Sequence, residues 1–200
     1  SVIHNGGDLE RFRIPPDKPM TKKIASVGYI NYAKNPTLLL YCFARIHAAD
    51  PEYTLHIAGR FQETRYQLYF EHYLNRHPLP VQFDGWVDDM PSWFADKDFV
   101  ISTSLFESFH YAIAESMASG VLPLIHDWYG ASYLYPGDYL FGDPEDCLRL
   151  LKELETADRR AIAAKNRRFI AERYAQADKN VEIARLLQRT RATTDTAKKV

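Results

Sequence analysis

Two glutamates eight positions apart, Glu107 and Glu115, are the carboxylates best placed to act together on one ligand. The apolar, β-branched run 99–102 before them predicts a buried strand, and the apolar spacing that begins at Phe109 predicts a helix. Gly120 is placed to end that helix in a left-handed conformation. Glu107 then falls in the loop, and Glu115 lies two turns up the helix. Eight helical residues rise about 12 Å, comparable with the span of a nucleotide sugar from hexose to ribose.

The expected surroundings of Glu115 also favour a ligand. On the helix it lies among Tyr111, Ala114 and Ala118, a flank that is small and mostly apolar. A carboxylate is costly to bury there without a hydrogen-bond partner, which a ligand would supply. The free N–H groups and positive dipole end of the helix suit a pyrophosphate. The spacing alone also allows a plainer interpretation, in which Glu107 is a first-turn acid and Glu115 lies on a solvated face, because Glu is common in helices.

The same stretch resembles the donor-site signature of the retaining glycosyltransferases with the GT-B fold (glycosyl transferases group 1, family 4 type). The matching residues are Ser104, Glu107, Phe109, Glu115, Met117-Ala118-Ser119-Gly120 and Pro123. The resemblance implies that Glu107 contacts the donor sugar and that Glu115 contacts the ribose hydroxyls. Ser108 and His110 differ from the family, which usually has glycine on each side of the Phe. Larger side chains at these two positions would crowd the sugar or change the direction of the loop.

A lysine in an earlier loop is the candidate cation for the diphosphate. Lys34 lies between a predicted strand, 23–27, and a helix, so it faces the ligand edge of an open sheet. From position alone a solvated loop charge is the favoured interpretation, and the family resemblance reverses this preference. The resembled family has Gly-Arg-Leu and then Lys here, both cations neutralising the diphosphate. Lys34 matches, but after Gly28 the Arg position is held by Tyr29.

Two further residues are expected at the same edge. Arg60 follows the predicted strand 53–58 and is conjectured to supply the missing cation, the alternative being an ordinary surface arginine. Trp86 ends the strand-like segment 79–87, which the resemblance places beside the nucleobase, so its ring would stack on the base; core packing is the alternative. His126 and Asp127 follow the strand 121–125, but no nucleophile stands in the right context to make them catalytic. Their loop can still line the sugar pocket.

Alternating strands and helices predict an α/β fold: a doubly wound, Rossmann-like parallel sheet of about six strands with helices on both faces. The remaining elements are expected as helices at 62–76, 88–96, from Asp143 and from Asp158, and a sixth strand at 139–142. By resemblance this is the C-terminal half of a GT-B fold. Residues 1–20 resemble the inter-domain crossover, so an N-terminal domain is expected to precede them. Residues 21–189 form the nucleotide-sugar-binding domain with C-terminal helices, and 190–200 a flexible tail.

Composition narrows the class of protein. The net charge of −1 is spread over interspersed acids and bases, unlike the basic footprint of a nucleic-acid binder. The sequence has no apolar run of the roughly 20 residues that span a bilayer and no signal peptide, so we expect a soluble, cytoplasmic protein. Cys42 and Cys147 have no pairing or metal-ligand spacing and are expected to be reduced. The basic helix after Asp158 is either a solvent face over the sheet or a surface in peripheral contact with the inner face of the membrane.

The sequence is thus interpreted as the donor-binding domain of a retaining glycosyltransferase that moves sugar from a nucleoside diphosphate sugar to a glycan, lipid or other acceptor, as in polysaccharide biosynthesis. Lys34 and Glu107 would carry the chemistry, Lys34 and backbone N–H groups stabilising the leaving diphosphate. The acceptor would bind the preceding domain, and this fragment alone would be inactive. No cofactor or metal is expected, since the resembled group is metal-independent and the chain has no strong metal-ligand cluster.

Two rival interpretations remain open. A degenerate nucleotide-sugar-binding module with a regulatory or assembly role is favoured by Tyr29, Ser108 and His110, and opposed by the intact glutamates and Lys34. A nucleotide-sugar epimerase would have the same double-domain fold, although the spacing of the glutamates fits a transferase better. Fold alone does not separate these functions.

Overall fold

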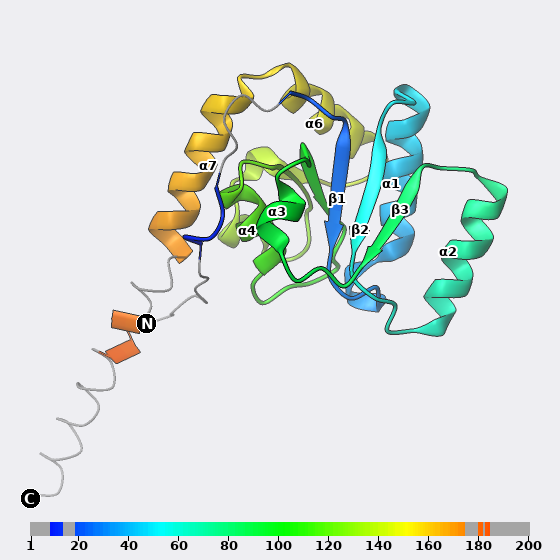
Figure 1. Ribbon diagram of the computed structural model, residues 1–200, viewed down its shortest axis with the longest axis horizontal. Helices are drawn as coiled ribbons and strands as arrows, with labels where there is room; N and C mark the ends of the chain where they lie inside the picture. Colours follow the sequence, from blue (N-terminus) through cyan, green and yellow to red (C-terminus); the bar gives the residue numbers. More distant parts are fainter. Residues whose placement is uncertain (1–8, 14–18, 175–179, 182, 185–200) are drawn as a thin grey trace, which may run out of the picture.

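The protein folds as a single parallel sheet of six strands, ordered β3-β2-β1-β4-β5-β6, with helices on both faces (Figure 1). This computed structural model describes residues 9–13, 19–174, 180–181 and 183–184. The strands are β1 (Lys23–Val27), β2 (Thr54–Ala58), β3 (Val81–Gly85), β4 (Phe99–Ser102), β5 (Leu122–His126) and β6 (Leu140–Phe141). The helices are α1 (Pro36–Ala49), α2 (Thr64–Arg76), α3 (Met90–Phe94), α4 (Tyr111–Ala118), α5 (Ala131–Leu134), α6 (Pro144–Thr156) and α7 (Arg159–Tyr174), with short 3-10 turns η1 (Tyr32–Lys34) and η2 (Gly137–Tyr139). The predicted doubly wound fold is confirmed.

The element boundaries differ from prediction where local chemistry intervenes. β3 is shorter than the predicted 79–87 because Pro80 cannot donate to a strand ladder and Gly85 turns the chain at φ 70°. α3 begins later than predicted, since the Asp89 side chain accepts from the Ser92 amide and caps the helix there. α5 was not predicted, because four residues are too few to show an apolar period. The crossover and tail predicted at the termini fall largely outside the described residues.

The strand order changes direction between β1 and β4, where open parallel sheets form a crevice beyond their carboxyl ends. The loops that follow these two strands are joined by hydrogen bonds. The Leu105 amide donates to the Ala33 carbonyl over 2.8 Å, and the Thr103 hydroxyl donates to the Lys34 carbonyl over 2.9 Å. These bonds bring segments about 70 residues apart in sequence to one edge of the sheet.

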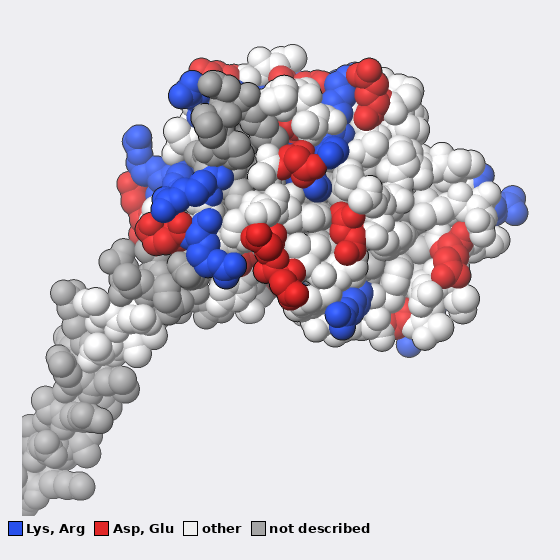
Figure 2. Space-filling view, in the orientation of Figure 1, with Lys and Arg blue, Asp and Glu red and all other residues white. Residues whose placement is uncertain are grey.

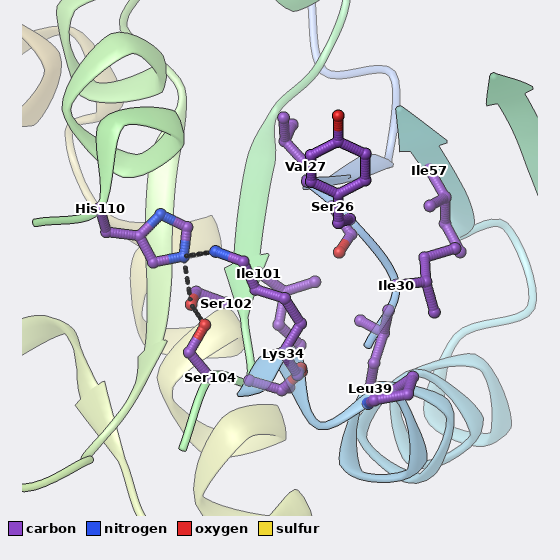
Figure 3. A pocket seen from close by; sticks show the side chains of 14 residues that line it. Ser26, Val27, Ile30, Lys34, Leu39, Ile57, Ile101, Ser102, Ser104 and His110 are labelled. Atoms are coloured by element: carbon purple, nitrogen blue, oxygen red, sulfur yellow. Dashed lines mark hydrogen bonds between the residues drawn. The ribbon is translucent and has the colours of Figure 1, made fainter. Parts of the chain in front are cut away.

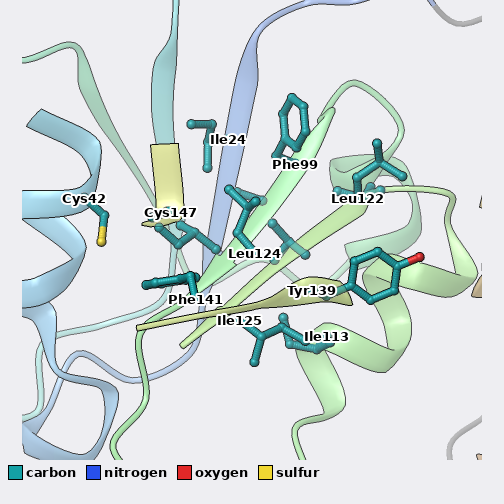
Figure 4. Close-up of a cluster of buried hydrophobic side chains, with 14 of the residues drawn as sticks. Ile24, Cys42, Phe99, Ile113, Leu122, Leu124, Ile125, Tyr139, Phe141 and Cys147 are labelled. Atoms are coloured by element: carbon teal, nitrogen blue, oxygen red, sulfur yellow. The ribbon is translucent and has the colours of Figure 1, made fainter. Parts of the chain in front are cut away.

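A continuous apolar core lies between the sheet and its helices (Figure 4). All four residues of β4 are buried, and Ile24, Leu122 and Leu124 on the neighbouring strands are fully enclosed. Cys42 of α1 and Cys147 of α6 belong to the same core, are free thiols and lie next to each other. Burial, with the neighbouring Cys42, holds the pKa of Cys147 well above its usual value. The sequence predicted their helices but not their proximity.

α7 is attached to the sheet through its basic side chains. Arg159 Nη2 lies 2.6 Å from Asp98 Oδ1, and Asp98 is completely buried at the start of β4. Asp98 also accepts from the amide and hydroxyl of Thr21, at 2.6 and 2.8 Å. Arg167 donates to the carbonyls of Phe12 and Ala118. The solvent-face interpretation of this helix is therefore wrong for Arg159 and Arg167, which bind neighbouring segments.

The remaining charged groups follow the mixed pattern seen in the sequence. Figure 2 shows Lys and Arg side chains interspersed with Asp and Glu over the visible face. Within the described part of the chain, none of the helices is both long and apolar enough to cross a bilayer.

We expect Asp98→Ala to lower the free energy of unfolding by about 3–5 kcal/mol, because it leaves the buried end of Arg159 and the Thr21 donors without their common acceptor. Arg45→Ala is the control, since it breaks an exposed pair with Glu145. Urea denaturation of both variants measures the difference. Equal, small losses would show that the buried pair does not hold α7 on the sheet.

Candidate functional site

A pocket of about 480 Å³ opens at the carboxyl edge of the sheet. Its walls come from the loops after β1, β2 and β3 and from the first turns of α4. This volume is within the range of small-molecule sites. Seven of the predicted site residues line it: Gly28, Tyr29, Lys34, Trp86, Phe109, His110 and Glu115.

Lys34 lines this pocket and forms an ion pair with Glu107. Lys34 Nζ is 2.6 Å from Glu107 Oε1, and the Ser104 hydroxyl donates to the same oxygen over 2.8 Å. Lys34 is positioned by η1, whose N-cap Asn31 accepts from the Lys34 amide, and by the following Asn35, which caps the start of α1. Neither ion-pair partner is fully exposed, with 28% of the Lys34 side chain and 14% of the Glu107 side chain accessible. The sequence did not predict this contact, and Glu107 is absent from the pocket lining, so the separate roles assigned to Lys34 and Glu107 stay predictions.

Lys34 also lines a small inner cavity of about 30 Å³, shown in Figure 3. Ser102, Ser104 and His110 contribute to its polar lining, and aliphatic side chains such as Ile30, Leu39 and Ile101 to its apolar lining. Ser102 Oγ is 2.8 Å from His110 Nε2 and 3.4 Å from Ser104 Oγ. His126 Nδ1 lies 2.9 Å from the Ser104 carbonyl, so His126 holds the loop after β4.

Sequence reasoning placed Ser104 in the motif but assigned no site role to it or to Ser102. The available signal was the run Ser102-Thr103-Ser104 directly after a buried strand, because three consecutive hydroxyl residues at a sheet edge need polar partners. All three are buried in the structure.

Glu115 lies on α4 at the wall of the pocket. Its neighbours Ala114 and Ala118 are buried, as the apolar flank predicted. Burial raises the pKa of the Glu115 carboxyl above its usual value, and the positive charge of Arg11 opposes this shift. Among the residues that the structure describes, no side chain or amide hydrogen-bonds the Glu115 carboxylate. The carboxylate therefore retains its acceptor capacity for a ligand in the pocket.

Trp86 also lines the pocket, with its ring tilted against that of Tyr29. It is 52% exposed, so the core alternative for this residue is wrong. Its ring lies 5.7 Å from that of Tyr29, at 37°, and the Arg60 guanidinium lies 5.4 Å from the Trp86 ring. Arg60 is therefore held against Trp86 and does not line the pocket. Its conjectured contact with a diphosphate stays a prediction.

The two positions that depart from the family pattern, Ser108 and His110, differ from each other in burial and in whether they line the pocket. Ser108 is exposed and lines neither the pocket nor the inner cavity. His110 is 4% exposed and lines both. Between them, Phe109 packs edge-on against Tyr174 at 4.9 Å and fixes the start of α4 to α7. Only His110 therefore changes the shape of the pocket.

The pocket depends on a close approach of two backbones. A Cβ on Gly59 would lie 1.9 Å from the Gly28 carbonyl oxygen, a distance that real atoms do not tolerate. Gly28 adopts φ 129°, and a Cβ there would lie 3.2 Å from Lys34 Cε. Glycine at both positions lets the β1 loop pass beside the end of β2 and lets Lys34 cross Gly28. Among the described residues, no group of three His, Cys, Asp or Glu side chains is arranged to hold a metal ion.

Comparison with known proteins identifies what this chain resembles. The sequence model of the glycosyl transferases group 1 matches residues 21–157. No curated protein sequence matches the chain. Among solved structures, Anabaena HepE in complex with UDP and glucose is similar at a TM-score of 0.83 and 20% identity, covering 94% of this chain and 56% of HepE.

Two other solved structures show the same fold. The C-terminal domain of the group 1 protein LpcC from Francisella tularensis gives a TM-score of 0.70 at 19% identity, covering 85% of this chain and 99% of that domain. TarM of S. aureus gives 0.69 at 19% identity, covering 93% of this chain and 38% of TarM. The chain thus spans little more than half the length of HepE and matches the whole of an isolated C-terminal domain.

We expect Gly59→Ala to destabilise the protein by about 1–3 kcal/mol or more, because the new methyl group forces the β1 loop away from β2. Gly137→Ala is the matched control, since a Cβ there meets nothing within 4 Å. Thermal unfolding compares the two variants. A Gly59→Ala protein as stable as the Gly137→Ala protein would contradict the proposed backbone approach.

Proposed function

This chain belongs to the glycosyl transferases of group 1, and from that premise we propose that it is the donor-binding domain of a retaining enzyme that uses a nucleoside diphosphate sugar. The observation that carries the proposal is the arrangement of one pocket. Its lining includes the partly buried Glu115 carboxylate, which has no hydrogen-bond partner among the described residues, the aromatic ring of Trp86, and Lys34. These groups suit a ribose, a base and a diphosphate respectively.

The chemistry follows from the charge that develops on the leaving group. When the bond between the sugar and the diphosphate breaks, negative charge grows on the β-phosphate. The Lys34 ammonium and the free amides at the start of α4 would stabilise that charge. Glu107, hydrogen-bonded by Ser104 and Lys34, would contact the hydroxyls of the sugar. Transfer with retention to a glycan, lipid or other acceptor, in cytoplasmic polysaccharide synthesis, completes the proposal.

The solved relatives support the ligand class. HepE was crystallised with UDP and glucose, and also with UDP-glucose. We therefore propose UDP and UDP-glucose as the first ligands to test on this chain. The acceptor would contact mainly parts that HepE has beyond the region this chain matches.

A specific observation favours a second candidate, a binding module without turnover. Lys34 is already engaged by Glu107, and Tyr29 occupies the position where the family pattern has its second cation. Such a module would bind nucleotide sugar with no transfer. Measuring transfer by the protein that contains this chain, with UDP-glucose and candidate acceptors, distinguishes the two functions.

The two glutamates should respond differently to neutralisation. Glu115→Gln removes the charge that strengthens its bonds to ribose hydroxyls, so affinity for UDP and for UDP-glucose should fall together, by about 10- to 150-fold. Glu107→Gln should leave UDP almost unaffected and weaken UDP-glucose by a similar factor. Calorimetric titration of both variants with both ligands measures four affinities. If Glu107→Gln weakened UDP as much as Glu115→Gln does, the two carboxylates would not be spaced along a nucleotide sugar.

The proposed site uses no metal, so chelation should leave UDP affinity unchanged. The phosphate charge is assigned to Lys34 and to backbone amides, neither of which needs a bridging cation. Titrations with EDTA and with added Mg²⁺ test this assignment. An affinity that rises tenfold with Mg²⁺ would refute it.

A further inference from the structure

His110 is the most buried ionisable side chain at the pocket, and its two ring nitrogens have different surroundings. It precedes α4 as the N-cap residue but makes no side-chain capping bond. Nε2 lies 2.8 Å from Ser102 Oγ, 3.4 Å from Lys34 Nζ and 3.6 Å from Glu107 Oε1. Nδ1, on the ring edge turned away from these groups in Figure 3, has no partner among the described residues.

The neighbours of Nε2 determine where the ring carries its proton. The Lys34 ammonium has donors only, so a nitrogen facing it must accept. The Ser102 hydroxyl can donate to the same nitrogen. The proton of the neutral ring therefore belongs on Nδ1. Burial, together with the nearby charge of Lys34, holds the pKa of His110 well below its usual value, so the ring is neutral at pH 7.

This assignment leaves the Nδ1–H of His110 without an acceptor among the described residues, at the start of a helix. Nδ1 itself is not fully enclosed, and His110 lines the pocket, so this donor is open to a ligand there. The amides of Tyr111 and Ala112, the first two of α4, likewise have no backbone acceptor within the described chain. Both residues line the pocket with His110. Three unpaired N–H donors thus belong to consecutive residues at one pocket wall.

We propose that the Nδ1–H of His110 donates a hydrogen bond to a phosphate oxygen of the donor's diphosphate, alongside the first amides of α4. The inference rests on the proposed function and adds a residue to it. The neutral Nδ1–H group of His110 serves in place of the arginine cation of the family pattern, whose position Tyr29 occupies in this chain. The contacts of Lys34 and Ser102 with Nε2 fix the tautomer of His110. His110 is then a binding residue for the leaving group as well as the residue that fills the inner cavity wall.

The test compares two polar substitutions that keep different nitrogens. The side-chain amide of asparagine can place an N–H near the position of Nδ1, whereas that of glutamine reaches the position of Nε2. We expect His110→Asn to bind UDP within about threefold of the parent, and His110→Gln to bind about tenfold or more weakly, as for one lost charge-assisted hydrogen bond. Equal affinity of both variants with the parent, or weaker binding by His110→Asn than by His110→Gln, would overturn the proposal.

A second measurement does not depend on the variants folding. A long-range ¹H–¹⁵N correlation spectrum of the labelled parent chain reports the tautomer of each histidine. We expect His110 to be protonated on Nδ1, with this signal shifting when UDP is added. Protonation on Nε2 would overturn the proposal.

The outcomes also separate this inference from the function on which it rests. If the parent chain does not bind UDP or UDP-glucose, the proposed function fails and the role of His110 fails with it. If the parent binds and Glu115→Gln weakens that binding while His110→Gln does not, the function is supported and only the role of His110 is refuted.

Discussion

The site depends on the pairing of two loops across the central strands β1 and β4. The bond from the Leu105 amide to the Ala33 carbonyl, with that from Thr103 to Lys34, fixes the separation of these loops. This pairing helps to bring together Lys34 and Glu107, which are 73 residues apart in sequence. The bonds are formed mainly by backbone groups, so the geometry tolerates changes in many side chains.

Much of the fold could be predicted because its signals are local. Apolar β-branched runs marked β1, β4 and β5, and the caps at Asp143 and Gly120 marked helix ends. Boundaries were missed where one side chain decides them, as with Asp89 before α3, and where an element is as short as α5. The burial of Asp98 beneath Arg159 was not predictable, because it needs three segments that the sequence does not show to be adjacent.

The sequence predicted which residues lie near the candidate site better than it predicted which of their side chains contact one another. Lys34, Glu115 and Trp86 line one pocket as expected, since Lys34 and Trp86 follow strands and Glu115 lies on the helix that begins at the same sheet edge. Arg60 was predicted from the same rule, yet it packs on Trp86, because an aromatic ring nearby attracts a guanidinium. The roles of Ser102 and His110 depend on hydrogen bonds between side chains, and periodicity carries no information about these.

His110 departs from the family pattern and forms a local hydrogen-bond network with neighbouring side chains. The family usually has glycine at this position, which leaves backbone amides as donors. Here a large side chain occupies the space and brings its own donor and acceptor. Histidine at this position therefore adds a side-chain donor to the pocket, while the backbone amides at the start of α4 remain available.

The ion pair between Lys34 and Glu107 has a consequence for how fast a ligand arrives. A lysine held 2.6 Å from a carboxylate has little field beyond a few ångströms, because the two charges cancel at a distance. An anionic ligand is then not drawn to the pocket from afar, and its capture depends on short-range contact after diffusion. Association should consequently vary little with ionic strength, unlike the steep salt dependence of sites that present an unpaired cation.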